Sequence, residues 1–140
     1  MRKDLSLEDL DDLLERPLVA VLATRRSDGS PLLSPVWHEY RDGAFHVTTS
    51  LHDVKVRHVR RDSSVSLLIY EPDPPWRGVE VRGEATVDVE ETRDRVRRIA
   101  VRYLGERAGT AYVGEGGSGA VLHLVPDEIR AWDFKDEMER

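Results

Sequence analysis

One short segment of the chain gathers side chains that could hold a phosphate group. Residues 52–61 contain four basic side chains and one acid, a local charge of 4 − 1 = +3 in a chain whose net charge is −6. Three hydroxyl residues, Thr48, Thr49 and Ser50, come just before this segment. Hydroxyls and amides at the start of a helix, with Lys and Arg reaching over them, are typical of a phosphate site. On charge alone, a solvated helix face is an equally good interpretation.

Other motifs predict no chemistry of their own. Residues 114–119 match the dinucleotide pattern G-x-G-x-x-G, but they follow an expected helix and precede an expected strand, whereas a phosphate-binding turn needs the opposite order. A mobile loop is the better interpretation. Ser118 has Ala120 where a nucleophile elbow requires glycine. The five histidines contain no helical pair or H-E-x-x-H pattern that would indicate zinc.

Composition excludes several classes of protein. The 140 residues fit one domain, 1–140, and the absence of cysteine excludes disulfides and thiolate chemistry. The net charge of −6 argues against a general nucleic-acid binder. The longest apolar run, residues 18–23, is too short to cross a membrane, and no signal peptide is visible, so we expect a cytoplasmic protein. Asn and Gln are absent, which leaves recognition of a ligand ring to backbone groups, Arg, Ser or Thr.

The order of secondary structure predicts a mainly β (α+β) fold, an antiparallel barrel with short flanking helices. The clearest strand is 79–89, where apolar and polar residues alternate strictly. Pro35 lacks an amide donor, so its strand should be an edge or bulged. Expected strands are 18–24, 31–40, 44–49, 65–70, 79–89, 120–125 and 128–134, and expected helices are 7–15, 52–61 and a segment between Thr92 and Gly105.

Several segments, taken in order, resemble the pyridoxamine-phosphate-oxidase-like split barrels that bind FMN or a deazaflavin, in particular the branch that depends on coenzyme F420. The matching segments are Ala23-Thr24, Asp28-Gly29-Ser30-Pro31, Ser34-Pro35-Val36-Trp37, Lys55-Val56-Arg57, Val65-Ser66-Leu67 and residues 79–85. The resemblance covers residues 7–134, nearly the whole chain. No single segment is diagnostic, but the ordered set is fairly specific. Many relatives have Asn after the Lys-x-Arg, where this chain has His58.

The resemblance also implies where a cofactor would bind. Its ring would lie beside Ser34, Pro35, Val36 and Trp37, while Thr48, Thr49, Ser50, Lys55 and Arg57 would hold the phosphate. Arg60 and Arg61 would meet the acidic tail that F420 has beyond its phosphate, and Trp76 and Arg77 would reach the site from a partner subunit. Trp37 as an ordinary core residue, and Arg60 and Arg61 as ordinary surface residues, remain alternatives. No residue is assigned as a catalytic acid and no metal is expected.

The favoured hypothesis from this resemblance is an oxidoreductase that binds F420 and transfers a hydride to a small conjugated organic substrate. The alternatives are an FMN-dependent oxidase or reductase of the same fold and a non-catalytic module that binds a flavin or haem.

We also expect a homodimer. Trp37, Trp76 and Trp132 are many large rings for a chain with 6% aromatic residues, and such rings concentrate at interfaces.

Overall fold

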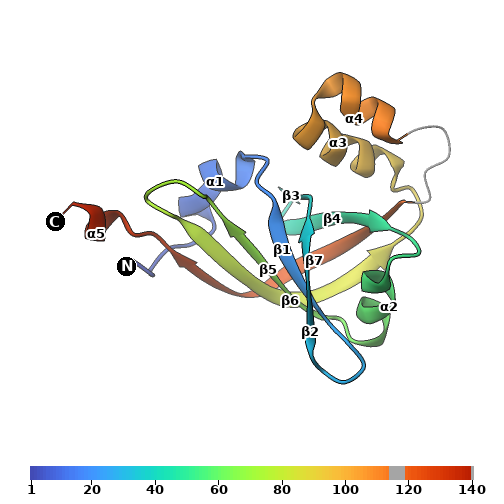
Figure 1. Ribbon diagram of the computed structural model, residues 1–140, viewed down its shortest axis with the longest axis horizontal. Helices are drawn as coiled ribbons and strands as arrows, with labels where there is room; N and C mark the ends of the chain where they lie inside the picture. Colours follow the sequence, from blue (N-terminus) through green and yellow to red (C-terminus); the bar gives the residue numbers. More distant parts are fainter. Residues whose placement is uncertain (114–118, 140) are drawn as a thin grey trace.

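The computed structural model describes residues 1–113 and 119–139, in which seven strands and six short helical segments are formed (Figure 1). The strands are β1 (Ala20–Arg25), β2 (Pro31–Val36), β3 (His38–Arg41), β4 (Ala44–Ser50), β5 (Ser64–Tyr70), β6 (Gly78–Asp88) and β7 (Gly119–Trp132). The helical segments are η1 (Glu8–Leu10), α1 (Asp11–Glu15), α2 (Val54–Arg61), α3 (Arg93–Leu104), α4 (Glu106–Val113) and α5 (Lys135–Met138).

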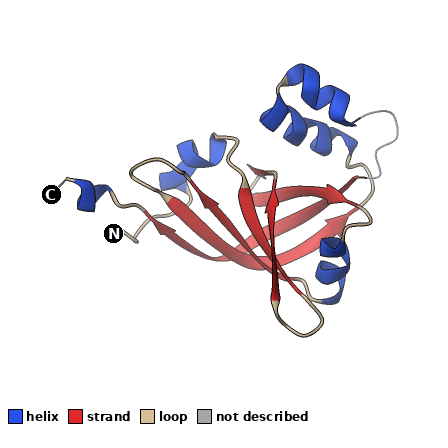
Figure 2. Cartoon of the chain, in the orientation of Figure 1, coloured by secondary structure: helices blue, strands red, loops and turns tan. Residues whose placement is uncertain are grey.

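All seven strands belong to one antiparallel sheet in the order β2-β1-β5-β6-β7-β4-β3. Figure 2 shows the sheet curled on itself, with the helices around its periphery. The chain passes from β2, at one edge, to β3, at the other edge, through the single residue Trp37. The two edges are therefore tied together by one residue without pairing along their length, which makes this a split barrel. The fold class predicted from the sequence is confirmed.

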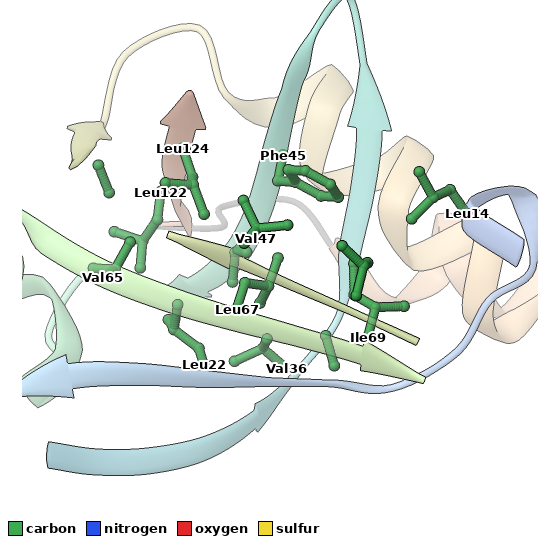
Figure 3. Packing of buried hydrophobic residues seen from close by; sticks show 14 of the residues in the cluster. Leu14, Leu22, Val36, Phe45, Val47, Val65, Leu67, Ile69, Leu122 and Leu124 are labelled. Atoms are coloured by element: carbon green, nitrogen blue, oxygen red, sulfur yellow. The ribbon is translucent and has the colours of Figure 1, made fainter. Parts of the chain in front are cut away.

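The core lies inside the curl, where alternate residues of the strands meet. Val65, Leu67 and Ile69 of β5 point inward, and Leu122 and Leu124 of β7 pack with them (Figure 3). Leu10, Leu13 and Leu14 of η1 and α1 belong to the same buried cluster, so the first helical segment covers one end of the barrel. Apolar burial of this kind is the main favourable term in folding.

Two arginines of α3 bind groups on β3 and at the end of α1. Arg98 donates to both carboxylate oxygens of Glu39, at 2.8 and 2.9 Å. Arg102 donates to the carbonyl oxygens of Leu14 and Arg16, at 2.7 and 2.6 Å. These carbonyls belong to the last turn of α1 and to the residue after it, where carbonyl groups have no helical partner, so Arg102 satisfies them.

Three of the expected strands were wrong. The strand expected at 31–40 is two strands separated at Trp37, and those expected at 120–125 and 128–134 are one strand with a bulge opposite Arg82 and Gly83. Additional helices form at α4 and α5. Thr92 is the residue before α3, and its hydroxyl donates to the Gly119 carbonyl oxygen at 3.1 Å and not to the helix. Pro35 does lie in an edge strand, as its missing amide predicts.

No helix in the two described ranges is long and apolar enough to cross a membrane. The two ends of the described chain lie close together (Figure 1): the Met1 ammonium contacts a Glu137 carboxylate oxygen at 2.7 Å.

Candidate functional site

A groove of about 420 Å³ opens where the barrel is split. We call it the split groove. It brings together residues from the end of β2, from the end of β4 and the start of α2, and from α4. Its described lining is Val19, Pro35, Val36, Trp37, Thr48, Thr49, Ser50, Asp53, Lys55 and Tyr112. Seven of these residues were predicted to touch the cofactor.

The polar residues that line the split groove include Lys55 and three residues with hydroxyls, Thr48, Thr49 and Ser50. Those hydroxyls make no hydrogen bond to residues 1–113 or 119–139. Lys55 is largely buried, and its ammonium lies 3.0 Å from a carboxylate oxygen of Asp53. The groove thus offers hydrogen-bond donors and one cation at the same end.

Asp53 caps α2 and balances the charge of Lys55. Its carboxylate accepts from the Lys55 amide at 2.9 Å, which satisfies one of the free donors in the first turn of the helix. Burial opposes ionisation of this carboxyl, but the hydrogen bonds from the Lys55 amide and ammonium lower the pKa of Asp53 below its ordinary value. The carboxylate is therefore charged at neutral pH, and an entering phosphate would have to share Lys55 with it.

The other end of the groove is aromatic. Trp37 lies between two tyrosines: its ring stacks on Tyr103 at 5.2 Å with an interplanar angle of 9°, and lies 5.4 Å from the Tyr112 ring. Tyr103 is fixed in turn, because its hydroxyl donates to the Leu18 carbonyl oxygen at 2.8 Å. Burial raises the pKa of Tyr103, so the hydroxyl stays protonated. Trp37 therefore packs within the chain and also lines the groove.

The remaining basic residues of α2 lie elsewhere. Arg57, Arg60 and Arg61 are all exposed and none of them lines the split groove. The Arg61 guanidinium donates to the Arg25 carbonyl oxygen at 2.6 Å, and Arg25 rather than Arg61 lies near Asp62, at 3.8 Å. Of the four basic residues predicted near the phosphate and the tail, the structure brings only Lys55 into the groove.

His58, which replaces the Asn of many relatives, ties α2 to β1. Its Nδ1 atom lies 2.9 Å from the hydroxyl of Thr24, and both side chains are buried. Burial lowers the pKa of His58, and the nearby charges of Arg61 and Arg26 lower it further, so the imidazole is neutral at pH 7. This contact fixes the helix that presents Lys55.

Three other predicted residues also lie outside the split groove. Ser34 is half-buried in β2 and is not part of the lining. Arg77 donates to Glu71 at 2.6 Å and to Asp12 at 2.9 Å, so within this chain it joins the loop after β5 to α1. Trp76 is 46% exposed. Their predicted contribution from a partner subunit stays a prediction.

Sequence reasoning missed Tyr112 and the helix that presents it. Gly105, with φ +89°, ends α3 as the sequence predicts, but a second helix, α4, follows at once. Gly109 made α4 hard to predict from the sequence, because glycine has a low helix propensity. It is needed because a Cβ at this position would overlap the backbone of Val101 in α3.

A second groove adjoins the first. We call it the α3–α4 groove; its volume is about 280 Å³. Its described lining is Thr48, Thr49, Ser50, Thr92, Arg93, Val96, Tyr112, Val113 and Gly119. Two larger grooves, of about 530 and 550 Å³, contain none of the predicted site residues. Within the described ranges no cluster of His, Asp and Glu could hold a metal. The glycine-rich loop lies, except for Gly119, outside the described residues.

Comparison with known proteins identifies the family. The sequence matches the pyridoxamine 5'-phosphate oxidase family over residues 6–133, and the chain belongs to this family. The resemblance seen in the sequence is thereby confirmed, and the chain has the fold of flavin-type oxidoreductases. No curated protein matches it closely enough to add to this.

Solved structures agree on the fold. Conserved hypothetical protein Rv2991 from Mycobacterium tuberculosis is similar with a TM-score of 0.79 and 25% identity, over 97% of this chain and 89% of that one. An F420 reductase is similar with a TM-score of 0.70 and 25% identity, over 85% and 94%. The FAD and heme binding protein from Mycobacterium smegmatis has a TM-score of 0.77 at 17% identity, over 96% and 74%, which supports the fold alone.

Proposed function

We propose that the chain is an oxidoreductase that binds coenzyme F420 in the split groove and reduces a small conjugated organic substrate. The observation behind the proposal is that one groove joins a hydroxyl-and-lysine end to a strand-edge and aromatic end. A phosphate fits the first end and a planar ring fits the second. The similarity to an F420 reductase favours the deazaflavin over FMN.

In this proposal the chain binds and orients the cofactor, which supplies the hydride when bound. Thr48, Thr49 and Ser50 donate to phosphate oxygens, and Lys55 adds a charge-assisted hydrogen bond. The exposed edge of β2 at Pro35 and the side chain of Trp37 lie along the ring. The tail of F420 continues past the phosphate, and Arg60 and Arg61 remain the cations proposed to meet it. Their exposure limits each such contact to about 1 kcal/mol or less.

The alternatives rest on the same groove. An FMN-dependent oxidase or reductase would use the same phosphate end, and a flavin- or haem-binding module would bind without turnover. F420 has an acidic tail that FMN lacks, so the salt dependence of binding distinguishes the two cofactors. F420 binding should weaken more steeply as the ionic strength rises.

The test combines binding and turnover. The purified protein is titrated with F420 and with FMN at low and high salt, and reduced F420 is then mixed with 2-cyclohexen-1-one while its reoxidation is followed. We expect tighter binding of F420, a steeper salt dependence and reoxidation that requires the protein. Tighter binding of FMN would favour the FMN alternative. Binding of F420 without reoxidation by a panel of enones would favour the carrier.

A further inference from the structure

We propose that Asp53 determines which kind of phosphate the split groove accepts, and that it favours a phosphate diester, as in F420, over a phosphate monoester, as in FMN. The proposal rests on the function proposed above, because it concerns the phosphate in the same groove. It assigns to one carboxylate the choice between two cofactors that share a tricyclic ring, a ribityl chain and a phosphate.

The phosphates of the two cofactors differ in charge. The phosphate of FMN is a monoester with a second pKa of about 6, so it carries a charge of about −1.5 to −2 at pH 7. The phosphate of F420 is joined to the ribityl chain on one side and to the acidic tail on the other. It is therefore a diester and keeps a single negative charge. A site can distinguish the two by the amount of negative charge that it balances.

The split groove has little positive charge with which to balance a phosphate. Lys55 and Asp53 are the only charged residues in its described lining, and their formal charges cancel. The Lys55 ammonium lies 3.0 Å from the Oδ1 atom of Asp53, so its charge is already shared with a carboxylate. The hydroxyls of Thr48, Thr49 and Ser50 donate hydrogen bonds but are neutral. This arrangement suits a singly charged group better than a doubly charged one.

Asp53 is held in its place beside Lys55 by its backbone and its side chain. Its amide donates to the Ser50 carbonyl oxygen at 3.0 Å, and its carbonyl oxygen accepts from the Val56 amide at 3.1 Å. Its Oδ1 atom accepts from the Lys55 amide at 2.9 Å, which caps α2. The carboxylate therefore cannot turn away without uncapping the helix. A phosphate oxygen bound to the Lys55 ammonium would lie within about 6 Å of it.

Repulsion by Asp53 acts unequally on the two phosphates. Each unit of negative charge on the phosphate is repelled, so the factor lost by a doubly charged group is about the square of the factor lost by a singly charged one. Over about 6 Å, even with the dielectric constant of water, these factors are about threefold for one charge and about tenfold for two. The carboxylate thus offsets much of what Lys55 would give to a second charge.

The experiment compares FMN with its methyl phosphodiester, which has the same ring and ribityl chain but a singly charged phosphate. Asp53→Asn removes the negative charge and keeps a side chain that caps helices equally well. Asp62→Asn, directly after the last residue of α2 and outside the described lining of the groove, is the matched control. Fluorescence titration at about pH 8 measures the binding of both ligands and of F420. Circular dichroism checks the fold of each variant.

We expect wild type to bind the methyl diester about tenfold more tightly than FMN. Asp53→Asn should raise the affinity for FMN about tenfold and that for the methyl diester about threefold, whereas Asp62→Asn should change neither. Equal gains for the two ligands, or no gain for either, would overturn the role of Asp53 and leave the cofactor site intact. If wild type fails to bind F420 while the FMN pair behaves as expected, the proposed function is refuted and the selectivity stands. If wild type binds none of the three ligands, both proposals are refuted.

Discussion

Lys55 and Arg57 are two positions apart on α2, yet they point to different sides of the helix. Lys55 is largely buried in the split groove beside Asp53, and Arg57 is exposed to solvent. The sequence alone treats them alike, since both belong to one basic segment. Burial separates them, because a charged hydrogen bond is worth more where water is excluded.

A pair of substitutions tests this difference. Lys55→Ala should weaken F420 binding about tenfold or more, because it removes a charge-assisted bond of roughly 1.5–3 kcal/mol. Arg57→Ala should change it by less than about fivefold, as expected of an exposed charge. Fluorescence titration measures both, circular dichroism checks the fold, and Lys55→Arg should restore part of the affinity. Equal losses in the two alanine variants would show that Arg57 shares the site.

His38 should make the protein sensitive to acid. It is fully buried, and its Nε2 atom has no hydrogen-bond partner in the described chain. Burial, with a smaller effect of the Arg102 charge, lowers the pKa of His38 from 6.5 to about 3. The unfolded chain therefore binds a proton below about pH 6.5 that the folded chain excludes. The free energy of unfolding then falls by about 1.4 kcal/mol per pH unit through this window.

Urea unfolding at about pH 7 and about pH 5 measures this loss. The drop in unfolding free energy between the two should be about 2 kcal/mol smaller in His38→Phe than in wild type. His52→Phe, at an exposed position, should keep the wild-type dependence. If His38→Phe loses as much stability in acid as wild type does, protons bound by other groups account for the sensitivity.

At the scale of elements, the sequence predicts strands well wherever alternation is strong. Strands β1, β5 and β6 lie close to where they are expected, because one face of each must be buried. The sequence alone does not show which distant strands pair in the sheet. Two features depend on strands that are far away in sequence. Trp37 carries the chain between the two edges of the sheet, and residues 120–132 continue through a bulge as one strand. The same limit applies to the site: Tyr112 enters it only because α4 folds back on α3.

Gly109 is the residue that allows α4 to lie close to α3. A Cβ at this position would overlap the Val101 backbone, so Gly109→Ala should force the helices apart and cost about 1–3 kcal/mol. Tyr112 would move away from Trp37, so tryptophan fluorescence and near-ultraviolet dichroism should change in the folded state. Thr110→Ala, at an exposed position of α4, is the control. A Gly109→Ala variant with wild-type stability would show that the α3–α4 contact is looser than described.

At the scale of the whole molecule, the outer face of β2, β1 and β5 is open in the single chain. Leu33 is 65% exposed and Tyr70 is 46% exposed there. Beside them, Arg82 pairs with Glu128 and Arg130 pairs with Glu80, so positive and negative side chains alternate on β6 and β7. A second copy turned by two-fold symmetry would meet both apolar residues and opposite charges, which is how isologous dimers form. We therefore propose this face for the predicted homodimer.

Two of the three tryptophans that suggested a dimer have partners within the chain: Trp37 stacks on Tyr103, and Arg130 lies 4.7 Å over the ring of Trp132. The exposed face of β2, β1 and β5 is therefore the stronger reason to expect a dimer. Multi-angle light scattering at micromolar concentration should give twice the chain mass for wild type and the chain mass for Leu33→Asp. Val89→Asp, exposed after β6, should remain dimeric. A wild-type protein of single-chain mass would contradict the proposal.

A crystal structure of the protein soaked with F420 tests most directly whether the split groove is the cofactor site. Density for the ring is expected beside Pro35 and Trp37, with the phosphate on Thr48, Thr49, Ser50 and Lys55. Density in another groove, such as the one of about 530 Å³ over Arg25, Arg82 and Glu128, with the split groove left without ligand, would contradict it.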